Sequence, residues 1–88
     1  MKRISILGST GSIGRSTLDV VDAFGDELSV AGLAAGGNLE LLAEQVRRYR
    51  PELVSVRNER DVAPLRERIG SEVEIVHGTD GACAVASL

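Results

Sequence analysis

Apolar residues in this chain fall into two alternating patterns. Four short apolar runs predict strands, and the first, with two isoleucines and no regular alternation, suits a strand buried on both faces. Between the runs, apolar residues recur at helical spacing. The predicted strands cover residues 3–7, 28–34, 53–56 and 72–77. The predicted helices cover residues 12–24, 39–50, 61–69 and 79–88.

Residues at the ends of these segments support the helix assignments. Asn38 and Thr79 suit the capping position before the second and fourth helices. A proline fits only the first turn of a helix, so Pro64 places the start of the third helix near Asp61, and Gly70 suits the position after its end. We expect the core-facing stripe of the first helix to comprise Ile13, Thr17, Val20, Val21 and Phe24.

The fourfold alternation of strand and helix predicts an α/β fold with a parallel sheet and right-handed crossovers. We expect a Rossmann-like doubly wound sheet with the strand order 3-2-1-4. In that order the turn after the first strand lies at the switch point, where such sheets bind their ligands. The fourth strand then forms an uncovered edge, so we expect the chain to be truncated after it, as the N-terminal piece of a longer polypeptide.

The turn after the first strand holds three glycines at three-residue spacing, in the sequence GSTGSIG. Gly8 allows an unusual backbone angle, Gly11 lets a phosphate approach the backbone, and Gly14 lets the helix pack closely on the strand. Free N–H groups at the start of the helix attract an anion, which favours a nucleotide phosphate site over a plain connecting turn, although GxxGxxG departs by one position from the common GxGxxG fingerprint. Short hydroxyl side chains can add donors or cap the helix: Ser9, Thr10 and Ser12.

The end of the second strand indicates which nucleotide is bound. Sites for NAD usually place Asp or Glu there to hold the ribose 2′-hydroxyl, whereas residues 34–38 read AAGGN. Without a carboxylate nothing repels a 2′-phosphate, and backbone N–H groups near Gly36 and Gly37 can contact it, which favours NADPH over NADH. The loop holds no Lys or Arg to grip that phosphate, and a simple loop before the Asn38 cap is the alternative.

Composition narrows the function classes. The 88 residues suit one small domain, and 43% hydrophobic and 26% charged residues are typical of globular proteins. A net charge of −3, with no basic cluster and few aromatic residues, argues against nucleic-acid binding. The apolar stretch near the N-terminus ends at Gly8, too early for a signal peptide or a membrane span. The lone Cys83 has no partner for an internal disulfide, which fits the cytoplasm.

The remaining polar residues form no catalytic pattern. We expect His77 to be a surface residue at a strand end, and Cys83 to be an ordinary small side chain of the last helix. Arg15 lies close enough to the glycine turn to approach a phosphate, but we expect it to be solvated. We also expect the nearby acidic residues to form a solvated face: Asp19, Asp22 and Asp26.

Residues 6–14 (ILGSTGSIG), followed by STLDVV at residues 16–21, resemble the N-terminus of the 1-deoxy-D-xylulose 5-phosphate reductoisomerase family. Residues 35–38 and 54–56 fall where that family places its second and third strand ends, so the resemblance spans most of the chain. It implies an oxidoreductase that uses NADPH and a divalent metal, Mg or Mn, to convert 1-deoxy-D-xylulose 5-phosphate to 2-C-methyl-D-erythritol 4-phosphate in non-mevalonate isoprenoid biosynthesis.

The resemblance also implies which residues contact NADPH. They are Thr10, Gly11, Ser12 and Ile13 in the first loop, and Gly36, Gly37 and Asn38 in the second. Some members of the family have lysine at the position of Gly37. The catalytic, metal-binding and substrate-binding residues, and the C-terminal domain, are expected beyond residue 88. Residues 1–88 are therefore expected to be an incomplete NADPH-binding domain, inactive alone, from a protein that is a cytoplasmic homodimer at full length.

Two alternatives remain open at this point. One is another Rossmann NAD(P)-dependent reductase with a different small substrate, since a fold does not select its chemistry. The other is a stand-alone nucleotide-binding module, which a stable oligomer covering the edge of the fourth strand would favour. Asp-Ser-Glu and Asn-Lys-Glu-Ser segments after residue 88 would favour the reductoisomerase.

Overall fold

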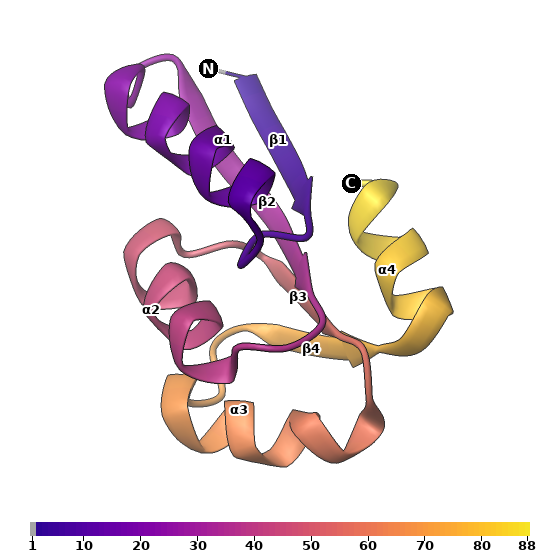
Figure 1. Cartoon of the computed structure of the whole chain (residues 1–88). Coiled ribbons are helices and arrows are strands. Elements are labelled where there is room, and N and C mark those ends of the chain that lie inside the picture. Colours follow the sequence, from indigo (N-terminus) through magenta and orange to yellow (C-terminus); the bar gives the residue numbers. More distant parts are fainter. Residues whose placement is uncertain (1) are drawn as a thin grey trace.

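Four parallel strands form one sheet in the computed structural model, which describes residues 2–88 (Figure 1). The strands are β1 (Lys2–Leu7), β2 (Leu28–Ala35), β3 (Leu53–Val56) and β4 (Glu74–His77). The helices are α1 (Ser12–Ala23), α2 (Leu39–Tyr49), α3 (Val62–Ile69) and α4 (Gly78–Ala86), and a short 3-10 helix, η1 (Glu59–Asp61), precedes α3. The predicted α/β alternation is confirmed, with bounds close to those expected from the sequence.

The strands lie in the order β1-β2-β3-β4, so the predicted order 3-2-1-4 is wrong. β4 pairs with β3, through Val54 opposite Ile75 and Ser55 opposite Val76, rather than with β1. The reason is that α3 packs beside α2 and carries the chain one step further in the same direction. The exposed ends of β4, Glu74 and His77, suit this outer position in the sheet.

Helices cover both faces of the sheet, and the chain changes face only after β4. Figure 1 shows α1, α2 and α3 on one side and α4 on the other. α4 packs against β1, β2 and β3, where Val85 is fully buried in a small second core with Ala34 and Leu53. The larger core lies under the first three helices and comprises Ile6, Leu18, Val21, Val30, Leu33, Ala35, Leu42, Ala43, Val46, Val54, Val56 and Leu65.

An irregularity in β2 adjusts which side chains face this larger core. Val30 pairs with Ile4 and Gly32 pairs with Ser5, which leaves Ala31 as an extra residue. Because side chains of a strand alternate between faces, the extra residue lets Val30 and Leu33 lie on the same face. Gly32 then faces α4 and the residues that follow it, because a Cβ there would lie 3.1 Å from Val85 Cγ1 and 2.7 Å from Leu88 Cδ1.

The buried face of α1 differs from the predicted stripe. Val21 is buried as predicted and Thr17 is half-buried, whereas Ile13, Val20 and Phe24 are exposed. Gly14 and Leu18 are the other buried residues of the helix. Hydrophobic periodicity misses this face because its closest approach to the sheet is made at Gly14, which has no side chain. A Cβ on Gly14 would lie 2.6 Å from Ser9 Cα, so the helix contacts the strand end backbone to backbone.

The predicted helix ends are mostly correct. Asn38 Oδ1 accepts a hydrogen bond from Leu41 N at 3.1 Å and caps α2. Pro64 lies in the first turn of α3, where its missing N–H costs nothing, and Gly70 follows the helix with φ +79°. The prediction that Thr79 caps α4 is wrong, because Gly78 already begins that helix and no side chain caps it.

Gly14→Ala is expected to destabilise the chain, because the new methyl group would overlap the backbone of Gly8 and Ser9. Overpacking of this kind costs roughly 1–3 kcal/mol. Urea unfolding of the 88-residue chain, followed by circular dichroism, measures the change in unfolding free energy. Gly37→Ala is the matched control, since a Cβ there meets nothing within 4 Å. An unfolding free energy for Gly14→Ala equal to that of the wild type would contradict this account of the packing.

Candidate functional site

The glycine turn after β1 is tied to the end of the neighbouring strand. The N–H groups of Gly8 and Ser9 both donate to Ala34 O, at 2.7 and 3.1 Å. Gly8 has φ +71°, a backbone angle that side chains disfavour, and this angle lets the chain turn sharply out of β1. Gly11 N–H then donates to Gly8 O at 3.0 Å and closes the turn. The turn is therefore fixed at the carboxyl end of β1 and β2.

The start of α1 is open toward solvent. Gly11 is the capping residue, with no side-chain hydrogen bond, and its carbonyl accepts the first helical bond, from Arg15 N at 2.9 Å. The N–H groups of residues 12–14 therefore have no acceptor within the helix. A Cβ on Gly11 would have only Gly8 O near it, at 3.4 Å, so nothing inside the chain requires glycine there. The first turn of α1 also has no acidic residue, which makes it a suitable site for an anion.

The residues expected to contact a nucleotide in this turn are accessible. Gly11, Ser12 and Ile13 are exposed and Thr10 is half-buried. Ile13 has 84% of its surface exposed, which is unusual for a large apolar side chain. Ser9 differs from expectation, because it is fully buried and its hydroxyl faces the interior without a partner among the described residues. Its side chain is thus no donor to a ligand in this structure.

The second loop lies beside the first because parallel strands end at the same edge of a sheet. Gly36 and Gly37 follow β2, and Asn38 uses its side-chain oxygen to cap α2. Gly36 is half-buried, while Gly37 and Asn38 are exposed. Figure 1 shows the turns after β1 and β2 at the same end of the sheet. The residues predicted in the two loops are therefore brought to one edge.

Arg57 belongs to the same edge and was missed in the sequence. It follows β3 directly, and its guanidinium lies against the backbone of Gly36, where a Cβ would come within 2.6 Å of Arg57 Nη2. A cavity of about 310 Å³ lies there, between the strand ends and the start of α4. The signal available in the sequence was the position of Arg57 directly after a predicted strand, because ligands of such sheets bind at the carboxyl ends of the strands.

Gln45 was also missed, and it supports the first loop from α2. Its side chain is only 6% exposed, and Nε2 donates to Ser9 O at 2.9 Å. Oε1 is buried without a partner among residues 2–88. A glutamine between Leu42 and Val46, on the apolar side of a helix, was the signal in the sequence. The hydrogen bond links the helix that follows the second loop to the backbone of the first.

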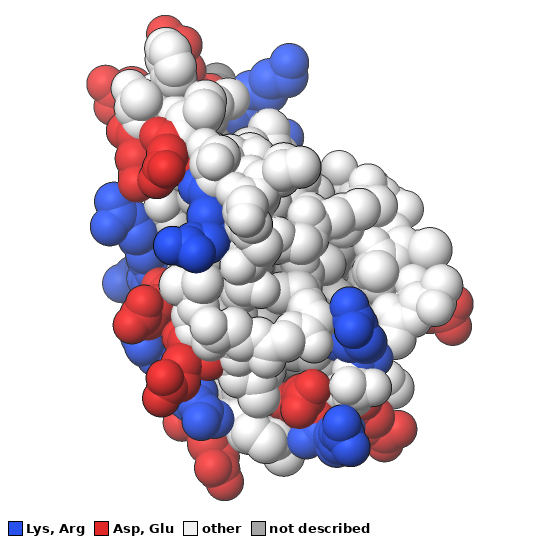
Figure 2. All heavy atoms as spheres, in the orientation of Figure 1, with Lys and Arg blue, Asp and Glu red and all other residues white. Residues whose placement is uncertain are grey.

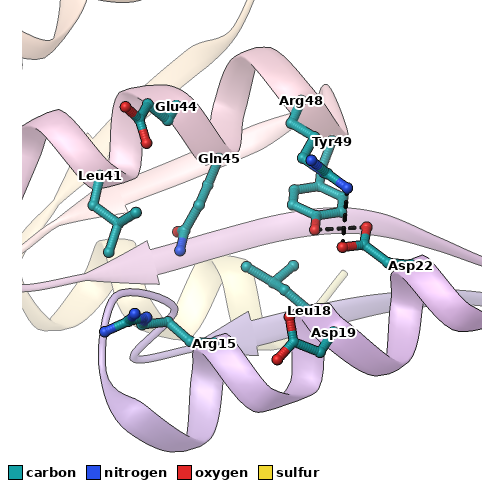
Figure 3. Close-up of a pocket in the computed structure, with 9 residues that line it drawn as sticks. All are labelled: Arg15, Leu18, Asp19, Asp22, Leu41, Glu44, Gln45, Arg48 and Tyr49. Carbon is teal, nitrogen blue, oxygen red and sulfur yellow. Dashed lines mark hydrogen bonds and ion pairs between the residues drawn. The ribbon is translucent and has the colours of Figure 1, made fainter.

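A second cavity, of about 230 Å³, lies between α1 and α2 (Figure 3). At one end, Asp22 pairs with Arg48 at 3.0 Å and accepts a hydrogen bond from Tyr49 at 2.8 Å. Burial and this hydrogen bond raise the pKa of Tyr49. Asp22 therefore joins the two helices, while Asp19, Asp22 and Asp26 are all exposed, as expected of a solvated face. Arg15 lies at the opposite end of the cavity.

Other candidate chemistry in the described residues is limited. His77 and Cys83 are exposed, as expected, at the end of β4 and on α4. No three His, Cys, Asp or Glu side chains within residues 2–88 come together in a way that suits a metal ion. None of the helices in this part of the chain has the length and apolar character needed to cross a membrane.

Comparison with known proteins identifies the family. The profile of the 1-deoxy-D-xylulose 5-phosphate reductoisomerase family matches residues 4–88. Proteins of that name from Chlorobium phaeobacteroides and Desulforamulus reducens are 53% and 54% identical, each over 99% of this chain. The chain spans about 23% of the length of each relative.

Solved structures share the fold. The reductoisomerase from Zymomonas mobilis in complex with NADPH aligns over 90% of this chain and 21% of its own, with 34% identity and a TM-score of 0.82. A DOX-P reductoisomerase in complex with magnesium aligns over 99% of this chain and 22% of its own, with a TM-score of 0.91. Its sequence identity is 24%, so this second match shows the fold alone.

Gln45→Leu is expected to loosen the first loop, because Ser9 O loses its buried donor. Leaving a buried acceptor without a partner costs roughly 1–3 kcal/mol. The amide protons of Gly8 and Ser9 should exchange faster, as measured by hydrogen exchange with NMR detection. Glu44→Leu, at the exposed neighbouring position, is the control and should leave their exchange unchanged. Unchanged exchange in Gln45→Leu would show that the side chain does not hold the loop.

Proposed function

Because the chain belongs to the 1-deoxy-D-xylulose 5-phosphate reductoisomerase family, we propose that it is the N-terminal NADPH-binding part of such an enzyme. The complete enzyme converts 1-deoxy-D-xylulose 5-phosphate to 2-C-methyl-D-erythritol 4-phosphate, in non-mevalonate isoprenoid biosynthesis. The proposal extends to a cytoplasmic homodimer at full length. The observation that carries it is the start of α1, where no side chain caps the free N–H groups, beside a second loop that has no carboxylate.

The first loop suits the pyrophosphate of the cofactor. Three N–H groups, of residues 12–14, lack helical acceptors, and the positive end of the α1 dipole favours negative charge there. Gly11 is exposed and has no side chain, so a phosphate can approach its backbone. The hydroxyls of Thr10 and Ser12 are further donors, and the exposed Ile13 side chain offers an apolar contact to a ring.

The second loop suits the adenosine half. Gly36, Gly37 and Asn38 present backbone groups at the start of α2, and no acidic side chain in residues 34–38 repels a phosphate. A 2′-phosphate is therefore tolerated where a loop with Asp or Glu would reject it. The related Zymomonas mobilis structure is described in complex with NADPH, which supports the same cofactor here.

The role of this segment is to bind and orient rather than to react. NADPH supplies a hydride when it is bound. The two loops fix the phosphates, and Gln45 holds the first loop in place through Ser9 O. The described residues offer no fitting ligand set for Mg or Mn, so we assign neither metal binding nor a catalytic residue to this segment. Another Rossmann reductase, the earlier alternative, is not favoured by the family match.

The wild-type chain is expected to bind NADPH more tightly than NADH in calorimetric titration. Gly11→Val should weaken binding of both cofactors roughly tenfold or more, because the side chain displaces the pyrophosphate from several charge-assisted hydrogen bonds. Circular dichroism should show the fold unchanged, since the space around Gly11 is open. Wild-type affinities that are equal for the two cofactors, or undetectable for both, would contradict the proposal.

A chimera tests the activity of the whole enzyme. Residues 1–88 replace the matching segment of the Chlorobium phaeobacteroides relative, to which they are 53% identical. We expect NADPH oxidation that depends on 1-deoxy-D-xylulose 5-phosphate, followed by the absorbance of the reduced cofactor. The same chimera with Gly11→Val should show a raised KM for NADPH. A folded chimera with no activity would count against the assignment.

A further inference from the structure

Arg57 is placed by the sheet beside the second loop, although it lies about twenty residues further along the sequence. It is the first residue after β3, and β3 pairs in parallel with β2 so that Val56 lies opposite Ala35. The next residues of the two strands, Arg57 and Gly36, therefore come together. A Cβ on Gly36 would lie 2.6, 2.8 and 2.9 Å from Nη2, Cζ and Nε of Arg57. Gly36 thus leaves room for the guanidinium.

The cavity at this edge has one charged side chain in its lining. Leu7, Gly8 and Gly36 line it together with Arg57, and no Asp or Glu does. The two ion pairs found within residues 2–88 do not include Arg57. Figure 2 shows charged side chains gathered over the side of α1, α2 and α3 and a largely uncharged surface toward α4. Basic groups interrupt this uncharged surface near the end of β3. The guanidinium is therefore available to an anion.

The chemistry of a guanidinium selects the kind of anion. Its planar N–H groups match two phosphate oxygens at once, and it stays charged at all physiological pH values. In sheets of this class, the end of β2 receives the adenosine ribose, and an arginine nearby accommodates a 2′-phosphate. Residues 34–38 contain no Lys or Arg, so a cation must come from another element if this phosphate is gripped.

We propose that Arg57 is the specificity-determining residue of the cofactor site, binding the 2′-phosphate that distinguishes NADPH from NADH. This inference rests on the proposed function and adds to it the residue that makes the choice. Gly36 and Gly37 complete the site by allowing the phosphate and the guanidinium to approach the backbone. The absence of a lysine at position 37 is compensated from the neighbouring strand.

The test compares Arg57→Ala with wild type, in the 88-residue chain and in the chimera. We expect NADPH affinity to fall roughly 10- to 100-fold, the usual worth of a hydrogen-bonded charged pair, and NADH affinity to change less than about twofold. Adenosine 2′,5′-bisphosphate and 5′-AMP serve as competing probes, and only the former should lose affinity. Arg57→Lys should retain part of the preference. In the chimera, KM for NADPH should rise with kcat unchanged.

Arg60→Ala is the matched control, because Arg60 is an exposed arginine in η1 outside the cavity lining and its loss changes the net charge equally. It should leave the preference for NADPH intact. If wild type prefers NADPH and Arg57→Ala keeps the same ratio, the role of Arg57 is refuted while the proposed function stands. Equal weakening of both cofactors would also refute it, by pointing to a structural role. Wild-type protein that binds neither cofactor would refute the proposed function and this inference together.

Discussion

The carbonyl of Ala34 is the point on which the candidate site depends. It accepts two hydrogen bonds, from the N–H groups of Gly8 and Ser9, and so fixes the glycine turn to the end of β2. The position of the turn sets where α1 begins, and Gly14 then brings the helix against the backbone of Ser9. Gln45 holds the same segment from the other side, through Ser9 O. These contacts between distant segments therefore set the position and direction of the free N–H groups at the start of α1.

Much of the fold and of the candidate site could be predicted from local signals in the sequence. The glycines, the Asn38 cap and the proline in the first turn of α3 each act within a few residues of the chain, so their consequences follow from the sequence alone. Positive φ at Gly8 and close packing at Gly14 agree with the roles expected for the first and third glycines. The two predicted loops meet because parallel strands share an edge, which is a property of the fold class.

Contacts between distant segments were less predictable. The strand order was wrong because a helix of similar length can carry the chain to either side of a growing sheet, and the choice depends on packing between α2 and α3. Gln45 and Arg57 were missed for the same reason, since their partners, Ser9 and Gly36, lie far away in the chain. The predicted buried face of α1 was partly wrong because Gly14 is buried, and a glycine has no apolar side chain that a hydrophobic pattern could detect.

The extra residue in β2 has a consequence for how the chain tolerates changes in length. Val30 and Leu33 lie on one face only because Ala31 interrupts the alternation between them. Deleting one residue at this point would turn every side chain beyond it, or every one before it, to the opposite face. Leu33 would exchange surroundings with Ala34, and the carbonyl that anchors the glycine turn would point elsewhere. A changed number of residues is therefore expected to be tolerated better in the turns at the opposite ends of the strands, where the helices lead back into the sheet.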